Sequence, residues 1–79
     1  MSKQEVNKDS LKEIINTAQE KLKDAAENPE NYDSKAVSAL QTAVSNGTEV
    51  FKNPVSIQSE VDEQVDAINV AINNLAKVA

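Results

Sequence analysis

The residues best suited to chemistry are carboxylates in the last third of the chain, where Asp62, Glu63 and Asp66 form the densest acidic group. Two carboxylates that share a concave, partly desolvated site can do acid–base work or bind a hard cation. The spacing of these three residues lacks the glycine-containing alternation of a calcium loop. We therefore interpret them as the solvated acidic face of a helix, and not as a metal or catalytic site.

A second group of oxygen ligands lies near the end of the first third, where Asn28, Glu30, Asn31 and Asp33 follow one another. A calcium loop would need a glycine at its sharp turn and a bidentate glutamate at its end, and this stretch offers neither. Asn and Asp favour turns and helix N-caps because their short side chains bond the nearby backbone. The stretch is therefore interpreted as a turn with capping residues.

Nucleophilic catalysis lacks support because the chain contains no His and no Cys. Ser34 followed by Lys35 does not have the spacing of a Ser–Lys catalytic pair. A single glycine cannot build a Gly-rich phosphate loop. The other serines considered as nucleophiles are Ser38, Ser45 and Ser59. The sequence therefore predicts a protein that is not an enzyme, without catalytic, cofactor-binding or metal-ligating residues.

The charge of the chain argues against nucleic acid as a partner. Thirteen Asp and Glu residues outnumber eight basic residues, all of them Lys, so the net charge of -5 has the wrong sign for a phosphate backbone. No stretch of about 18 consecutive apolar residues is present, so no membrane insertion is expected. Residues 1–5 contain no apolar segment that would indicate a signal peptide.

The elements that carry these residues follow from two breaks in the chain. Pro29 and Pro54 both lie in polar stretches and divide the sequence into three segments. For 79 residues one domain is expected, and with one Phe, one Tyr and no Trp its core must be aliphatic. Each segment places apolar residues at the three- and four-residue steps of an amphipathic helix.

The first helix is predicted over residues 8–27. Asn7 is the expected N-cap, with Val6 and Leu11 placed to pack together as a hydrophobic staple. Ser10 with Glu13 forms a rival capping box, so the start of the helix stays open by about three residues. The apolar stripe consists of Leu11, Ile14, Ile15, Ala18, Leu22, Ala25 and Ala26.

The second helix is predicted over residues 34–51, with Asp33 as N-cap and a staple between Tyr32 and Val37. Its apolar stripe consists of Val37, Leu40, Val44, Gly47 and Phe51. The stripe includes a glycine, and the pair Asn46–Gly47 could instead form a turn that splits the segment. No strand pattern flanks this pair, so we expect one helix, at a cost of about 1 kcal/mol for the glycine relative to alanine. If the glycine faces the core, a neighbouring helix can approach closely there.

The third helix is predicted over residues 57–78, with Ser56 as N-cap. Carboxylates gather near its N-terminal end, where they interact favourably with the helix dipole. It has the most regular apolar repeat of the three, which consists of Ile57, Val61, Val65, Ile68, Ile72, Leu75 and Ala79.

Three amphipathic helices with short connections cannot each bury an apolar stripe alone. The sequence therefore predicts an all-α fold, an antiparallel up-down-up three-helix bundle over residues 7–79. Residues 1–6 are expected to be a disordered N-terminal tail, for which an artificial origin stays open. As an isolated module, the chain is expected to be a monomer.

Three residues remain that could belong to a binding surface. Val70 lies opposite the apolar seam of the third helix, and Val55 lies in the second loop beside Pro54. Single exposed apolar residues are normal on protein surfaces, which favours no special role for either valine. Tyr32 could stack on a sugar ring, but its staple with Val37 is the preferred interpretation.

The joint spacing of residues along the chain resembles the FIVAR module, a family found in various architectures. The most telling pieces are Tyr32 before the second helix, Asn53–Pro54 before the third, and the run from Gln58 to Asp62 that opens the third. Four residues depart from the family tendency: Asp33 stands for Thr, the pair Ala36–Val37 for Ser-Trp, and Ile57 for Thr. The full set that carries the resemblance is Val6, Asn7, Lys8, Leu11, Ile15, Ala18, Tyr32, Asp33, Val37, Leu40, Gln41, Ala43, Val50, Asn53, Pro54, Gln58, Glu60, Val61, Asp62, Val65, Ile68, Ala71, Ile72 and Leu75.

This resemblance implies a non-catalytic accessory module of large secreted or wall-attached proteins of Gram-positive bacteria, often glycoside hydrolases and adhesins, sometimes beside a dockerin. Within such proteins it implies a rigid spacer, or a unit that packs against adjacent modules of the parent protein or against another protein. The alternative is a protein-recognition module that binds a host or partner protein through an outer helical face. The expected location is secreted or cell-surface, and the partner-binding residues stay unknown.

Overall fold

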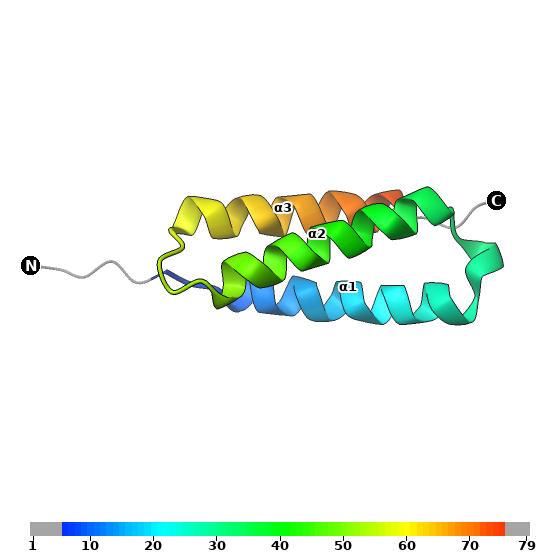
Figure 1. Ribbon diagram of the computed structural model, residues 1–79, viewed down its shortest axis with the longest axis horizontal. Helices are drawn as coiled ribbons and strands as arrows, with labels where there is room; N and C mark the ends of the chain where they lie inside the picture. Colours follow the sequence, from blue (N-terminus) through cyan, green and yellow to red (C-terminus); the bar gives the residue numbers. More distant parts are fainter. Residues whose placement is uncertain (1–5, 76–79) are drawn as a thin grey trace, which may run out of the picture.

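The computed structural model describes residues 6–75 of the chain. Helix α1 runs over Asp9–Glu27, α2 over Ser34–Lys52 and α3 over Gln58–Asn74, and the short 3-10 helix η1 over Pro29–Asn31 connects α1 to α2. The three long helices run antiparallel to their neighbours in the chain (Figure 1), and each pair of them is in contact. The all-α up-down-up bundle predicted from the sequence is therefore confirmed.

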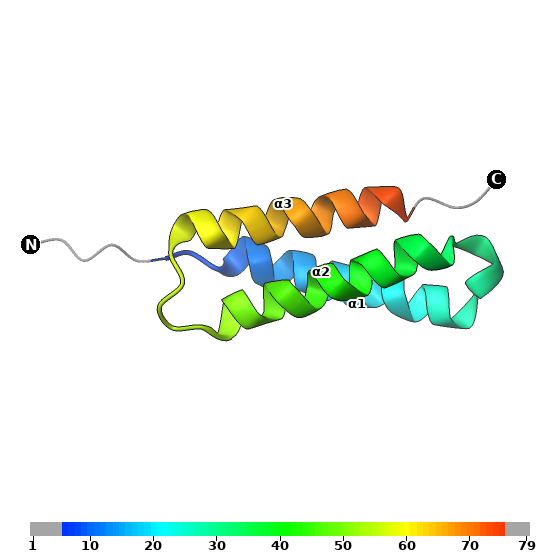
Figure 2. The same ribbon diagram turned by 45° about the horizontal axis from the view of Figure 1, so that its top comes forward.

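The bundle is a narrow rod whose two short principal extents are 17 and 15 Å. One end, here termed the η1 end, carries η1 and the end of α3 (Figures 1 and 2). The opposite end, termed the loop end, carries the start of α1 and the loop of residues 53–57 between α2 and α3 (Figures 1 and 2). A chain that passes through this fold therefore enters at one end of the rod and leaves at the other.

The core is a single seam of aliphatic side chains to which all three helices contribute. Leu11 of α1, Leu40 of α2 and Ile68 of α3 are completely buried, and all three belong to stripes that the sequence predicts. The full set of buried residues within the elements is Leu11, Ile15, Ala18 and Ala25 of α1, Leu40, Val44 and Gly47 of α2, and Val61, Ile68 and Ala71 of α3.

Two residues predicted to belong to the apolar stripes lie outside the core. Ala26 is exposed near the end of α1. Ile57 is 58% exposed because its backbone is extended, with φ of -99° and ψ of 165°, so the helical periodicity does not apply to it. The last stripe position, Ala79, and the expected helical residues 76–78 lie outside the described residues.

The start of α1 differs from both caps that the sequence predicts. The helix begins at Asp9, so Lys8 takes the N-cap position and Ser10 lies inside the helix. Asn7 nevertheless accepts a hydrogen bond at its side-chain Oδ1 from the Asp9 N–H, at 2.9 Å. Val6, predicted to be the last residue of the tail, is partly buried and packs against the core. It is apolar, and the backbone of the next residue, Asn7, is held by hydrogen bonds to Gln58. Residues 1–5 of the expected tail lie outside the described residues.

Gly47 marks a point where all three helices approach closely. Helix α2 is continuous through it, and the glycine is buried without a positive φ. A Cβ atom at this position would lie 2.8 Å from Cδ1 of Ile68 and 3.5 Å from Cδ1 of Leu11. The space that a side chain would fill is therefore occupied by α1 and α3, as expected for a glycine that faces the core.

A double-mutant cycle between Gly47 and Ile68 tests this approach. Gly47→Ala is expected to change the free energy of unfolding by less than about 1 kcal/mol, because better helix propensity opposes the contact with Ile68. Ile68→Val removes the Cδ1 atom that obstructs the new methyl group. It should lower stability by about 0.5–1.5 kcal/mol in the wild type and by clearly less in the Gly47→Ala background. Urea denaturation of the four proteins measures the coupling, and equal losses in both backgrounds would contradict the close contact.

Candidate functional site

The acidic residues considered for chemistry lie on a solvent-facing side of α3. Asp62, Glu63 and Asp66 are all exposed. Asp62 accepts a hydrogen bond from Nε2 of Gln58 at 3.1 Å, which is a bond within the same helix. Within residues 6–75, no group of three or more His, Cys, Asp or Glu side chains is arranged to hold a metal ion. The serines considered as nucleophiles, Ser34, Ser38, Ser45 and Ser59, are likewise exposed.

Polar side chains at the η1 end close around the carboxylate of Asp24. The hydroxyl of Tyr32 donates a hydrogen bond to its Oδ2, and Nδ2 of Asn28 donates to its Oδ1 at 3.0 Å. Tyr32 is half-buried and also packs against the core. Asp24 was not predicted as a site residue from the sequence, although its position on the last turn of α1, four residues before Asn28, is a signal that could have identified it.

The oxygen-rich stretch around η1 therefore has the turn and capping roles that the sequence predicts. Asn28 bonds back to α1, as described above, and its backbone N–H donates to the carbonyl of Asp24 at 2.8 Å. Asp33 is the N-cap of α2, where its Oδ1 accepts from the Lys35 N–H at 3.0 Å. These bonds fold the connection between α1 and α2 tightly onto the bundle.

The hydrogen bond to Asp24 raises the pKa of Tyr32 above its usual value, and burial and the negative charge of Asp24 act in the same direction. The neutral phenol donates to the carboxylate, whereas a phenolate would be repelled by it. Because the folded pKa is raised, this contribution to stability is complete below the unfolded value of about 10. It is lost as the pH rises through the folded pKa, so the bond is intact at neutral pH.

Gln58 joins the first turn of α3 to the chain that precedes α1. Its Oε1 accepts a hydrogen bond from the Asn7 N–H at 2.7 Å, and its Nε2 donates to the Asn7 carbonyl at 3.0 Å. The side-chain amide thus pairs with the backbone of a residue 51 positions away in the sequence. Asp62 accepts from the same Nε2 and so orients the amide. This pairing fixes the loop end as the bonds around Asp24 fix the η1 end.

Lys8 connects the same N-terminal segment to the end of α2. Its Nζ donates to the carbonyl oxygens of Phe51 and Asn53, both at 2.9 Å. The last carbonyls of a helix lack intrahelical partners and lie at the negative end of the helix dipole. The ammonium group of Lys8 supplies hydrogen bonds to these carbonyls and a positive charge at the negative end of the dipole. Asn7 and Lys8 therefore connect the start of α1 to both other helices.

The start of α3 corrects the cap predicted from the sequence. Ser56 is only 5% exposed, and its hydroxyl donates to the Val50 carbonyl of α2 at 2.8 Å. The N-cap position belongs to Ile57, whose backbone N–H donates to Oε1 of Glu60 at 3.0 Å. The prediction was wrong because the hydroxyl of Ser56 bonds the end of the preceding helix, a contact that depends on how α2 and α3 are joined.

The polar residues that carry the family resemblance are thus used within the fold. Gln58, Glu60 and Asp62 of the run that opens α3 each have an intramolecular partner, while Val61 between them is 1% exposed. Asn53 accepts a hydrogen bond at Oδ1 from the Val55 N–H at 3.0 Å, which shapes the loop. The side chains of these residues therefore form bonds that shape the loop end of the bundle.

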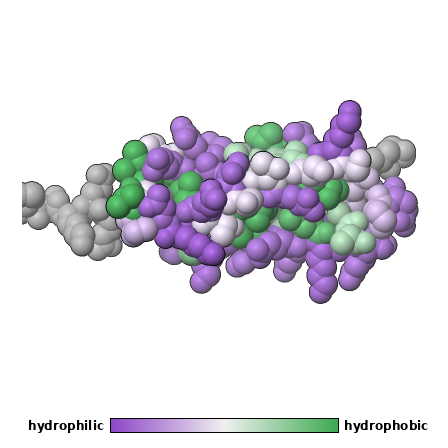
Figure 3. Space-filling view, viewed as in Figure 1, coloured by the Kyte–Doolittle hydropathy of each residue, from purple (hydrophilic) through white to green (hydrophobic). Residues whose placement is uncertain are grey.

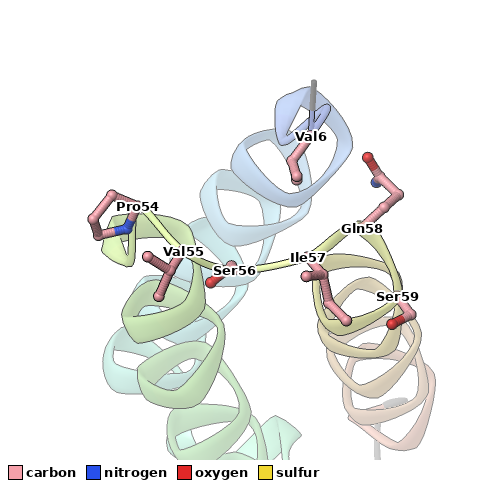
Figure 4. A pocket seen from close by; sticks show the side chains of 7 residues that line it. All are labelled: Val6, Pro54, Val55, Ser56, Ile57, Gln58 and Ser59. Atoms are coloured by element: carbon pink, nitrogen blue, oxygen red, sulfur yellow. The ribbon is translucent and has the colours of Figure 1, made fainter. Parts of the chain in front are cut away.

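Exposed apolar residues gather at the loop end. Val55 is 78% exposed and Ile57 58% exposed, and together with Val6 and Pro54 they contribute to the lining of an open hollow of about 520 Å³ (Figure 4). A hydrophobic area is visible at this end of the rod in the space-filling view (Figure 3). Val70, exposed by 57% as its off-stripe position predicts, lies on α3 and does not line this hollow. Val55 was considered as a surface residue from the sequence, whereas Ile57 was wrongly predicted to belong to the core stripe.

Titration of Tyr32 tests the arrangement at the η1 end, because the chain has one Tyr and no Trp. We expect the tyrosinate absorbance to report a pKa above the usual value of about 10 in the wild type. In Asp24→Asn the pKa should shift toward that value, because the amide keeps an acceptor but removes the negative charge. Glu20→Gln, which changes an exposed carboxylate of the same helix, serves as the control. An ordinary tyrosine pKa in the wild type would show that the bond to Asp24 is not formed in solution.

A comparison of Ser56→Ala with Val55→Ser tests the orientation of the loop. Ser56→Ala is expected to lower the free energy of unfolding by about 1 kcal/mol, because the buried hydroxyl loses its bond to Val50. Val55→Ser should change it by no more than about 0.5 kcal/mol, since the valine is exposed. Urea denaturation compares the two variants. The reverse ranking, which an inward valine and an outward serine would produce, argues against this loop conformation.

Comparison of the chain with models of known protein families finds a match to one family. The FIVAR domain family model matches residues 7–76, a range that includes both ends of the rod. No curated protein and no solved structure matches the chain. FIVAR domains are small modules that occur in multidomain proteins at the cell surface or outside the cell. No helix within residues 6–75 has both the length and the apolar character needed to cross a bilayer. The match takes in nearly the whole chain, and this protein therefore belongs to the FIVAR domain family.

Proposed function

We propose that this chain is a non-catalytic accessory module of a multimodular extracellular protein, carbohydrate-active or surface-attached, in which it acts as a rigid spacer that packs against its neighbours. The observation that carries the proposal is the use of the characteristic polar residues. Tyr32, Gln58 and Glu60 each form a hydrogen bond to another group of the same chain, at the two ends of the rod. Bonds within the chain are expected of residues that maintain the shape of a module. In a ligand site, the polar side chains would instead be free to bond the ligand.

Rigidity is supported by how the three helices are joined. The bonds around Asp24 hold the connection between α1 and α2, and those of Lys8 and Gln58 hold the start of α1 against the other two helices. Both ends of the rod are therefore closed by side-chain bonds as well as by the shared core. Since the chain enters and leaves at opposite ends, modules on either side would be separated by at least the length of a 19-residue helix, about 28 Å.

The alternative function, recognition of a host or partner protein through an outer helical face, has less support. Such a face needs a contiguous apolar area, since large exposed apolar patches mark interaction sites. Among residues 6–75, Val70 is the large apolar residue exposed on a helix, while Val55 and Ile57 lie in the loop. The exposed apolar surface thus favours contacts at an end of the rod over contacts along its side.

The spacer function predicts one fixed distance between the two ends. The chain has no Cys, so Glu30→Cys at the η1 end and Glu63→Cys near the loop end can carry two spin labels at exposed positions. We expect a single, narrow distance distribution in pulsed dipolar spectroscopy, because core and end bonds leave the helices one arrangement.

The matched control is a label pair within one helix, Lys12→Cys with Lys23→Cys, which gives the width due to the labels alone. A distribution for residues 30 and 63 that is several times broader than this control, or that has two maxima, would show that the module is not a rigid spacer.

A further inference from the structure

The segment that leads into α1 is held by side-chain bonds to both other helices. Gln58 of α3 pairs with the N–H and the carbonyl of Asn7, at 2.7 and 3.0 Å. Lys8 donates from Nζ to the carbonyl oxygens of Phe51 and Asn53 at the end of α2. We term Asn7, Lys8 and Gln58 the N-terminal clasp. Its bonds join residues that lie between 43 and 51 positions apart in the sequence.

The bonds of the clasp differ from those of a helix cap. Lys8 occupies the N-cap position of α1 without a side-chain bond to that helix, and the Asp9 N–H is instead satisfied by the side chain of Asn7. The Lys8 ammonium and the Gln58 amide connect the chain to α2 and α3. The clasp therefore fixes the position of the entering chain relative to the two other helices.

The clasp lies in a stretch that has few apolar contacts. Val6 is partly buried, and the next apolar residue, Leu11, is completely buried. Between them, Asn7, Asp9 and Ser10 are exposed. A helix end of this kind frays readily when only its own backbone bonds hold it. The clasp bonds supply an attachment where the core does not reach.

The two ends of the chain lie at opposite ends of the rod. The chain enters at the loop end, where Figure 4 shows Val6 and Gln58, and it leaves at the η1 end after Leu75, which is 2% exposed. Helices α1 and α3 both begin at the loop end and are in contact (Figures 1 and 2). Tension on the two ends therefore draws α1 along α3, and bonds that cross between the helices are loaded in shear.

The arrangement of the clasp bonds decides how they respond to such tension. The backbone bonds of a helix run along its axis, so tension at the end of a helix opens them one after another. The two bonds between Asn7 and Gln58 join the same pair of residues, so they share the load and break together. Lys8 adds a second attachment one residue further on. Tension that enters the fold thus meets the clasp before it reaches the backbone bonds of α1.

We propose that Asn7, Lys8 and Gln58 form a mechanical clasp, which transfers tension in the parent polypeptide from the entering chain to α2 and α3 and so prevents α1 from unwinding. This proposal rests on the proposed function, since a module is pulled at both ends only within a longer polypeptide. The clasp acts on the rate of unfolding under tension, which governs how long the folded module survives a pull. The rod then keeps its length under load as well as at rest.

Optical tweezers can pull the chain in two geometries that differ in whether the clasp bears the load. The chain contains no Cys, so DNA handles can be attached through cysteines added at both ends of the 79 residues, and the load then passes through the clasp. In the second geometry, Lys12→Cys replaces the N-terminal attachment. Lys12 is exposed on α1, so the load enters beyond the clasp. The unfolding rate at constant force is measured in both geometries.

The key variant combines Lys8→Met with Gln58→Ala, which removes the clasp bonds while the methionine keeps an unbranched side chain. With the ends pulled, its unfolding rate should rise by about tenfold or more over the wild type, because bonds that break together are lost. With the load entering at residue 12, the rise should stay below about threefold. Gln58→Glu keeps an acceptor for the Asn7 N–H but cannot donate to the Asn7 carbonyl, so its rise with the ends pulled should be intermediate.

Asn28→Ala is the matched control. It removes a side-chain bond to Asp24 at the η1 end, away from the point at which the load enters, so its effect on the unfolding rate should be equal in the two geometries. Circular dichroism and urea denaturation of each variant without handles check that it folds and measure its loss of stability at zero force. If the double variant does not fold, the comparison of geometries is made with Gln58→Glu.

Equal acceleration of the clasp variants in the two geometries would overturn the proposal, because the bonds would then stabilise the fold without bearing the load. An unchanged rate with the ends pulled would also overturn it, since another part of the fold would then open first. The label distance between residues 30 and 63 is measured without tension and tests the spacer function separately. A single narrow distance together with either of these outcomes leaves the spacer standing and removes only the clasp.

Discussion

The fold depends on a single aliphatic core to which all three helices contribute. With few aromatic residues, the interior consists of small and branched aliphatic side chains, and these stabilise a bundle only when the helices lie close enough to exclude water. At Gly47 the missing Cβ leaves the space that Ile68 and Leu11 occupy from the two other helices. The glycine disfavours the helix locally, but it lets the side chains of Ile68 and Leu11 pack closely against α2.

The aliphatic core holds the middle of the helices together, and polar side chains hold their ends. Asp24 gathers Tyr32 and Asn28 at one end, while Lys8 and Gln58 connect the start of α1 to the other two helices at the opposite end. These bonds satisfy backbone groups that helix termini leave unpaired and orient each connection.

The exposed apolar loop is the feature that core packing does not explain. Ser56 fills an inward position because its hydroxyl reaches the last turn of α2, and this turns Val55 and Ile57 outward. In an isolated domain, two exposed aliphatic side chains contribute no stability.

Local patterns along the chain were enough to predict the three helices, their order and the aliphatic core, because apolar periodicity, proline breaks and capping residues act over a few positions. The family was inferred separately, from a resemblance in the joint spacing of residues along nearly the whole chain. They also identified Asp33 as a cap and predicted that the second helix continues through Gly47. Only the packed structure shows which groups bond Asp24 and Gln58, and that Ser56 faces inward. Each of these contacts depends on how separate segments are brought together, and a local pattern carries no information about which distant carbonyl or carboxylate a side chain will meet.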